Sequence, residues 1–253
     1  MTWVVGRAGP FGHAVAVSDI RITVAGKEFD CLQKVYKVGN QLVLAFAGSV
    51  HIGFEAVAQA ATALTVAPEG GIWDPIYIAE TLPIGMRNLF AAFPQSEKAL
   101  GCHLMLLSAH PALNDGPAPW ARCFVHRYYS PDFEPIEAPQ ADIVSIGSGA
   151  RVQLYTAALK TLEEDTQMFK LEIAFPGGSG IALMSSLSSL LARVPQPGIS
   201  GHVQICLVGR QSVRLGHYSP QGFGPMPTLA TTREEFDQYL NGLGISSSQG
   251  ATC

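Results

Sequence analysis

The chain has 253 residues, of which 47% are hydrophobic and only 14% are charged, and its formal net charge at pH 7 is −4. A chain of this length can bury a sizeable core as one domain or as two. The slight acidic excess argues against nucleic acid or a membrane surface as a partner. Because so few residues are charged, we expect partner subunits to cover much of the surface, and the composition favours an oligomer.

Cysteine and histidine usage gives no sign of a metal site. The five cysteines are scattered without a CxxC pair, which argues against a zinc site or a disulfide framework. The seven histidines show no ligand spacing such as HExxH. The sequence shows no signal peptide and no apolar run long enough to span a bilayer. We therefore expect a cytoplasmic protein with no metal and no cofactor.

Residues 2–49 are predicted to form two β-hairpins. In the first, apolar and β-branched residues flank a Gly-Pro cluster at residues 8–12, a pattern typical of two antiparallel strands joined by a turn. Pairing the strands about this turn places Asp19 beside Thr2. A short strand and a polar turn are expected at residues 20–31.

The second hairpin is predicted to turn at residues 39–40, which are Gly-Asn. One of its strands carries Lys34 and the other contains residues 45–49. Antiparallel pairing then places Lys34 opposite Ala45 and brings Gly48 near the open end of the hairpin.

Thr2 is a candidate nucleophile. Its small side chain permits removal of Met1, after which Thr2 would carry the terminal amine. An N-terminal threonine is a self-sufficient nucleophile because its own amine can act as the base for its hydroxyl. The start of the chain is therefore the predicted active end.

The rest of the main domain alternates between helical and strand patterns. The Ala-rich segment Val50–Leu64 has helical spacing, and a second helix at residues 75–93 should be kinked or broken by Pro83 and Gly85. Further predicted elements are strands at 101–109, 120–130, 134–137 and 141–146, helices at 147–164 and 181–193, and a hairpin of 202–209 with 211–218. Two antiparallel sheets packed face to face, with a helix pair over each outer face, would bury all of these segments. The sequence therefore predicts an α+β fold arranged as a four-layer α-β-β-α sandwich.

Residues 219–253 read as an extension of a main domain at residues 1–218. A Gly/Pro-rich linker leads to Thr232 and Glu235, a capping box that opens a short helix to about Leu243. Residues 246–253 are polar and lack periodicity, so they are predicted to be disordered. The Pro/Gly-rich loop at residues 110–119 is long for a hairpin and is expected to project from the body.

Five motifs occur in a specific order along the chain. They are Thr2 at the first strand, Asp19-x-Arg21-x-Thr23, Lys34, Phe46-Ala-Gly48-Ser49, and Ile146-Gly-Ser148-Gly149. In this order they resemble the β-type subunits of the proteasome family, and most closely the bacterial HslV-like peptidases. The resemblance covers residues 2–215 and implies the N-terminal nucleophile hydrolase fold. The α-type subunits of the family carry an extra helix before the first strand, which is not found here.

The resemblance implies a catalytic role for each of five residues. The Thr2 hydroxyl would attack a peptide carbonyl, and Lys34, ion-paired with Asp19, would stabilise the developing alkoxide. The backbone N–H of Gly48 would donate to the tetrahedral oxyanion, and Ser148 would hold the Thr2 amine. Considered singly, Ser148 reads as a helix N-cap, and Asp19 with Lys34 reads as a structural ion pair.

The resemblance also implies the substrate contacts. Thr23 and Val50 would hold the substrate backbone as an added strand. Phe46, Ile22 and Tyr36 would border a pocket for its side chain. Because these side chains are apolar or aromatic, cleavage after hydrophobic residues is expected.

Two further residues are expected to support the site. Arg21 would be buried beside Asp19 and hold the floor of the site, and Ser200 belongs to a Ser-Gly pair near the last core strand. The family often has an acidic residue three positions before that serine, where this chain has Pro197. Orientation of the amine would then rest on Ser148 and on backbone groups.

The leading functional prediction is a threonine-type endopeptidase that cleaves peptides or unfolded proteins inside a self-compartmentalising ring. The resemblance implies a homo-oligomeric ring, stacked as a double ring, with an ATP-driven unfoldase as a potential partner. Two alternatives stay open. One is a weak or inactive scaffold subunit, which Pro197 supports. The other is a small-molecule amidase of the N-terminal nucleophile class, which would usually use Cys or Ser with an Arg-rich pocket.

Overall fold

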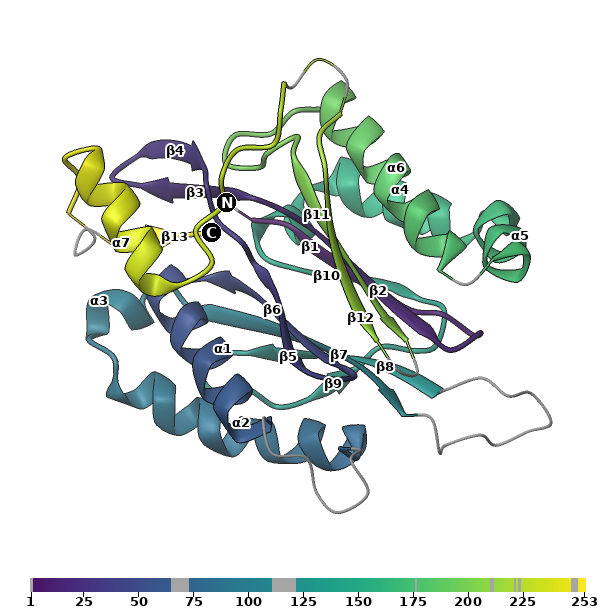
Figure 1. The fold of residues 1–253 in the computed structure, drawn as a ribbon, viewed down its shortest axis with the longest axis horizontal. Coiled ribbons are helices and arrows are strands. Elements are labelled where there is room, and N and C mark those ends of the chain that lie inside the picture. Colours follow the sequence, from purple (N-terminus) through teal and green to yellow (C-terminus); the bar gives the residue numbers. More distant parts are fainter. Residues whose placement is uncertain are drawn as a thin grey trace.

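The computed structural model describes residues 2–64, 73–110, 122–175, 177–209, 212–220, 222, 224–246 and 250–253. Within these residues, helices combine with antiparallel sheets, and the predicted α+β class is confirmed. Figure 1 shows the strands between two groups of helices. On one side lie α1 (Val50–Leu64) and α2 (Pro75–Ala92), and on the other lie α4 (Gln153–Glu163) and α6 (Gly178–Arg193).

Two five-stranded antiparallel sheets form the centre of the fold. The first has the order β10 (Ile143–Ile146), β1 (Val4–Ala8), β2 (His13–Asp19), β11 (Val203–Gly209) and β12 (Val213–Tyr218). The second has the order β5 (Val35–Gly39), β6 (Leu42–Gly48), β7 (Cys102–His110), β8 (Arg122–Tyr129) and β9 (Ile136–Glu137). A three-stranded sheet of β13 (Ala251–Thr252), β3 (Arg21–Val24) and β4 (Lys27–Asp30) lies near the ends of the chain.

Strand β6 shows how the sequence builds these layers. Successive side chains of a strand point to opposite faces, so Leu44 and Phe46 face one way while Val43 and Ala45 face the other. Leu44 and Phe46 belong to the apolar cluster shared with α1 and α2. Val43 and Ala45 belong to the cluster shared with β1, β2 and β11. Because both faces are buried, β6 reads as a continuous apolar run rather than an alternating one.

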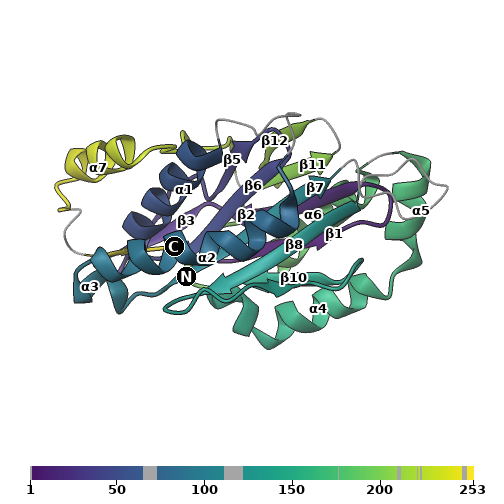
Figure 2. The ribbon, with the colours of Figure 1, turned by 90° about the horizontal axis from the view of Figure 1, so that it is seen from below.

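The first sheet is buried on both faces in the same way. Val4 and Ala16 face the second sheet, where β1 and β2 contact β7 and β8. On the opposite face, Val17 packs in a cluster with Tyr155 of α4 and Leu187 of α6. Figure 2, turned by 90° from Figure 1, shows α4 and α6 lying along the strands of this sheet.

Both predicted hairpins form, but each pairs one residue away from the expected partner. Asp19 pairs with Trp3 rather than Thr2, since the Asp19 N–H donates to the Trp3 carbonyl over 3.2 Å. Lys34 lies opposite Phe46 rather than Ala45, because Ala45 pairs with Val35 and the Phe46 N–H donates to the Lys34 carbonyl over 3.1 Å. The second shift begins at the turn, which lies at residues 40–41 rather than 39–40 because Gly39 pairs with Leu42. An irregularity between Lys37 and Gly39 offsets part of this change, so Lys34 ends one residue from its expected partner.

Several helix predictions need correction. Helix α2 runs without a break through Pro83, which is buried, as is Met86 one turn later. This burial compensates for the hydrogen bond that proline cannot make. Helix α6 begins at Gly178 rather than at residue 181. The short helices α3 (Gln95–Lys98) and α5 (Thr166–Ala174) were not predicted. The predicted strand at 134–137 is reduced to the two residues of β9.

Two sequence predictions fall on undescribed residues. The projecting loop at 110–119 lies outside the described residues apart from His110, and so does the first part of the strand predicted at 120–130. Within the part of the chain that the structure describes, no helix is long and apolar enough to cross a membrane.

The extension after residue 218 returns to the main body. Helix α7 (Arg233–Gly242) begins at the predicted N-cap, where the Thr232 hydroxyl accepts from the Glu235 N–H over 3.2 Å. Its Phe236 packs against Phe54 of α1, with ring centroids 6.0 Å apart, and Figures 1 and 2 both place α7 beside α1. Disorder was predicted for residues 246–253, but residues 251–252 form β13 against β3. For these residues the prediction is wrong, because the open edge of β3 supplies backbone partners that the segment's own composition does not reveal. Residues 247–249 lie outside the described residues.

Candidate active site

Thr2 is fully buried and is held by the turn at residues 147–149. The Thr2 N–H donates to the Ser148 hydroxyl over 2.9 Å, and the Gly149 N–H donates to the Thr2 carbonyl over 2.9 Å. Gly147 has φ +86, and a β-carbon there would collide with the Thr2 carbonyl oxygen. Met1 is still part of the chain, so the Thr2 nitrogen is an amide that stands in for the amine left by Met1 removal.

Ser148 lies beside the Thr2 nitrogen, where the resemblance places it, and it is not the N-cap residue of the helix that follows. Gly147 is the residue that precedes the short 3₁₀ helix η1 (Ser148–Arg151), and no side chain caps it. The next residue after Thr2 anchors the strand, because the Trp3 ring stacks on Tyr155 with centroids 4.4 Å apart.

Lys34 links Thr2 to the rest of the site. Its side chain is fully buried. Its Nζ lies 2.8 Å from Thr2 Oγ1, 3.0 Å from Asp19 Oδ1 and 2.5 Å from the Arg21 carbonyl oxygen. An ammonium group has three donors and no acceptor, and each donor here has an oxygen partner. The Lys34 ammonium is thus fixed in direct contact with the Thr2 hydroxyl.

The Asp19 carboxylate is buried but fully supplied with donors. Besides Lys34 Nζ, it accepts the backbone N–H groups of Trp3 over 2.9 Å, Arg21 over 3.1 Å and Ser200 over 3.3 Å. A buried charge costs a large desolvation free energy unless it is paired and hydrogen-bonded. These donors explain how the fold holds a carboxylate beside Lys34 in an apolar environment.

Arg21 was expected to be buried beside Asp19, and this expectation is wrong for its side chain. The Arg21 side chain is 26% exposed and binds Asp30, with Nε 2.6 Å from Oδ1, because β3 and β4 pair Arg21 with Asp30. Ser200 joins the two carboxylates, since its hydroxyl donates to Asp30 over 2.8 Å while its N–H donates to Asp19. Burial acts to raise the pKa of Asp30, but hydrogen bonds from Arg21 and Ser200 hold this pKa below its usual value.

Gly48, the predicted oxyanion donor, has a backbone conformation that favours glycine, and its N–H already has an acceptor. Its φ is +103, and a β-carbon would collide with the Gly101 carbonyl oxygen. The Gly48 N–H donates to the main-chain oxygen of Cys253 over 2.8 Å, and the Cys253 N–H donates to the Gly48 carbonyl over 2.9 Å. The Cys253 oxygen stands in for the carbonyl oxygen of a bound peptide.

The predicted substrate contacts come together around the same segment. Thr23 pairs with Thr252 across β3 and β13. Val50 does not hold this segment through its backbone as expected, because the backbone bonds described at this turn come from Gly48. Val50 instead contributes its side chain to the apolar cluster that contains Phe46, Ile22 and Cys253.

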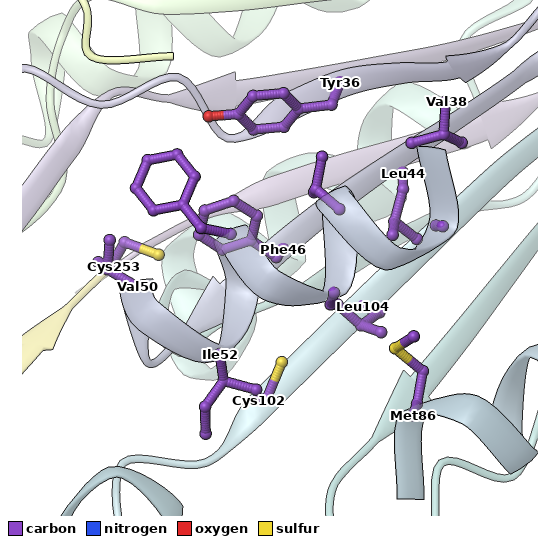
Figure 3. Close-up of a cluster of buried hydrophobic side chains, with 14 of the residues drawn as sticks. Tyr36, Val38, Leu44, Phe46, Val50, Ile52, Met86, Cys102, Leu104 and Cys253 are labelled. Atoms are coloured by element: carbon purple, nitrogen blue, oxygen red, sulfur yellow. The ribbon is translucent and has the colours of Figure 1, made fainter. Parts of the chain in front are cut away.

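The predicted side-chain pocket is apolar and filled. Figure 3 shows Cys253 beside Val50, with Phe46 and Cys102 nearby and Tyr36 across the cluster. Tyr36 stacks on Phe46 with ring centroids 6.0 Å apart. Burial raises the pKa of the Cys253 thiol to about 11, and nearby Lys34 offsets this only in part. The Cys253 side chain is therefore a small neutral group at pH 7.

Sequence reasoning missed Gln204 and Asp30. The Gln204 side chain is 2% exposed, and its Oε1 accepts the Lys34 backbone N–H over 2.8 Å. The only sequence signal for Gln204 is that a polar residue interrupts an apolar strand. Its partner, Lys34, lies 170 residues away in the sequence. Asp30 stands in a short polar turn segment with no local pattern that identifies its partners.

No protein-family model matches the chain, and a search of curated proteins returned no match. Among the described residues, no group of His, Cys, Asp and Glu is arranged to hold a metal ion. We therefore infer function from the arrangement around Thr2. That arrangement combines a hydroxyl, a buried ammonium, a backbone N–H donor and a hydroxyl next to the Thr2 nitrogen.

Proposed function

We propose that the chain is a threonine peptidase of the N-terminal nucleophile class, related to the β-type subunits of the proteasome family. The observation that carries the proposal is the 2.8 Å contact of Lys34 Nζ with Thr2 Oγ1, made while Asp19 binds the same ammonium. A buried ammonium needs three acceptors in any role, but here one of the three is the hydroxyl predicted to be the nucleophile. Ser148 beside the Thr2 nitrogen adds to this, because it is placed to orient the amine once Met1 is gone.

The reaction follows from these positions. After Met1 removal, the Thr2 amine titrates close to neutrality, with a reference pKa of roughly 7.7–8.0. The amine takes the proton of the Thr2 hydroxyl while Oγ1 attacks the peptide carbonyl, and the Gly48 N–H donates to the resulting oxyanion. The C–N bond then breaks, the leaving amine takes the proton from the Thr2 ammonium, and an ester to Oγ1 remains. Water hydrolyses this ester with the Thr2 amine again acting as base.

The layer arrangement supports the same class. Two antiparallel sheets share one apolar cluster, and helices cover the outer face of each sheet. We propose that this is the four-layer α-β-β-α sandwich of the N-terminal nucleophile hydrolases. Such a frame suits the chemistry because it buries the first strand, which positions Thr2, on both faces.

We further propose that the chain assembles into a homo-oligomeric ring, stacked as a double ring, in the cytoplasm. Exposed apolar side chains occur on both helix layers, including Tyr77 and Ile84 on α2, Leu154 on α4 and Ile181 on α6. Large exposed apolar groups on opposite sides suit contacts with more than one neighbouring subunit. Peptides or unfolded proteins would be the substrates, and an ATP-driven unfoldase would deliver the folded ones.

An inactive scaffold is the second candidate, because Thr2 is fully buried and the Gly48 N–H is occupied. A peptide epoxyketone separates the two, since the reagent needs both a free amine and a hydroxyl on one residue. Purified protein, both full-length and ending at Gly250, is incubated with the reagent, and the mass of the N-terminal peptide is measured. An adduct on Thr2 supports the peptidase, with Thr2→Ala as the matched control. A processed Thr2 that stays unmodified in both proteins favours the scaffold, and a retained Met1 contradicts the mechanism.

A further inference from the structure

The segment Ala251–Cys253 lies between two elements that flank Thr2. On one side, Ala251 pairs with Val24 and Thr252 pairs with Thr23, so the segment extends the β3–β4 sheet by one antiparallel strand. On the other side, Cys253 exchanges two backbone hydrogen bonds with Gly48. An extended segment that pairs with an exposed strand edge is how many peptide ligands are bound.

The main-chain oxygen of Cys253 occupies the position assigned to the reacting carbonyl. It accepts from the Gly48 N–H over 2.8 Å, the donor expected to bind the oxyanion. Burial raises the pKa of the Cys253 thiol, while Lys34 acts to lower it and Asp19 to raise it. A peptide could not reach the same donor until Cys253 leaves it.

The Cys253 side chain fills the pocket predicted for the substrate side chain. It is 4% exposed and belongs to the apolar cluster of Phe46, Val50 and Cys102. Figure 3 shows the sulfur pointing toward Phe46 and the start of α1. Because Phe46 stacks on Tyr36 and packs at a tilt against Phe54, the surrounding rings are held in place. A small apolar side chain fits here without moving them.

We propose that Ala251–Cys253 is an intrinsic pseudo-substrate that occupies the substrate groove and blocks Thr2, and that the groove is shaped for a small apolar side chain before the cleaved bond. This inference rests on the proposed peptidase function. The segment is tethered to the same chain through α7, whose Phe236 and Leu240 are fully buried. A tethered ligand competes at a high effective concentration, in the millimolar range for short flexible linkers.

Blocking by this segment is expected to be reversible. It is held by the backbone pairing of β13, which has two residues, by the exchange with Gly48 and by the small buried side chains of Ala251 and Cys253. Segments with few buried contacts open locally at a lower free energy than the core. Binding of a suitable peptide, or a movement of α7, would therefore release the groove.

The first test compares the rates at which a peptide epoxyketone modifies Thr2. Cys253→Pro removes the N–H that donates to Gly48, whereas Cys253→Ala keeps this N–H and is the matched control. We expect modification to be at least about tenfold faster in Cys253→Pro and in the protein ending at Gly250, because a tethered competitor is removed. Cys253→Ala should stay close to the unmodified sequence. Equal rates in all four proteins would overturn the inference while leaving the peptidase intact.

The second test follows the Cys253 thiol and does not depend on turnover. In the free protein, iodoacetamide should modify Cys253 slowly, because the side chain is 4% exposed. Once an epoxyketone occupies Thr2, Cys253 should become reactive while Cys102, which is fully buried, stays protected. Rapid alkylation of Cys253 before the epoxyketone is added would show that the segment does not occupy the groove.

Pocket size is tested with two epoxyketones that differ only in the residue next to the reactive group. In the protein ending at Gly250, the alanine compound should react faster than the phenylalanine compound, and the reverse order would overturn the assigned pocket. If Thr2 is processed but reacts in none of these proteins, the proposed function fails. A protected Cys253 would then identify the segment as a structural strand and not as an inhibitor.

Discussion

Replacing Lys34 with methionine tests the centre of the proposed site. Methionine is similarly long and unbranched, but it removes the three donors that bind Thr2 Oγ1, Asp19 and the Arg21 carbonyl. Removing one partner of a buried ion pair destabilises a protein by about 3–5 kcal/mol. We expect a loss near the lower end, about 3 kcal/mol, because the backbone donors to Asp19 remain in place.

The same substitution should abolish most of the reactivity of Thr2. Without the ammonium, the developing alkoxide at Oγ1 loses its nearest positive charge. Loss of one stabilising donor in an active site typically lowers the rate by about 10²–10³-fold. The rate of Thr2 modification by an epoxyketone, followed by mass spectrometry, should therefore fall at least about a hundredfold. Urea unfolding followed by circular dichroism measures the change in stability.

Two controls make this prediction specific. Lys37 lies in β5, three residues after Lys34, but is exposed, so Lys37→Met should change the free energy of unfolding by less than about 0.5 kcal/mol. Adding Asp19→Asn to Lys34→Met removes the uncompensated charge and should recover part of the stability without recovering the reactivity of Thr2. If the epoxyketone modifies Thr2 as fast in Lys34→Met as in the unchanged protein, Lys34 has no catalytic role.

Three further predictions concern single positions. Ser148→Ala removes the acceptor of the Thr2 N–H, and we expect a loss of about 1 kcal/mol in stability and about tenfold slower modification of Thr2 at pH 7. Gly48→Ala places a methyl group against a carbonyl at φ +103; urea unfolding should show a loss of about 1–3 kcal/mol. Burial acts to raise the pKa of Glu172, but hydrogen bonds from His13 and Ser179 lower that pKa to about 2 from its usual 4.5. The associated stability, up to about 3 kcal/mol, is present above pH 4.5 and is lost as the pH falls toward 2, whereas Glu172→Gln should remove this contribution and make the free energy of unfolding less dependent on pH in this range.

Much of the fold could be predicted from local patterns. Apolar β-branched runs around turn residues identified both hairpins and their approximate pairing, and helical spacing identified Val50–Leu64 and the start of α7 at its Thr232 cap. These features are set by neighbouring residues, so they are readable from a short window of sequence. The predicted approach of Thr2, Asp19 and Lys34 also followed from hairpin pairing, although each register differs by one residue.

The errors in strand register show which features local sequence patterns do not predict. The irregularity that shifts β5 against β6 has no marker in the sequence around Gly39. Pro83 and Gly85 were expected to kink or break α2, yet the helix continues through both to Ala92, with Pro83 buried. Tertiary packing of a helix face can outweigh a local preference of this kind.

The sequence alone therefore determined most of the strands and helices and most of the residues gathered near Thr2, because alternation, spacing and turn chemistry act over a few residues. Only the tertiary structure decided the partners of those residues. The Arg21 side chain binds Asp30 instead of Asp19, and Gln204 supports Lys34 from 170 residues away. It also decided that residues 251–252 form a strand, since a polar segment gains order from the edge of β3 and from Gly48. Backbone pairing of this kind is almost independent of side-chain identity, so no pattern in the segment could reveal it.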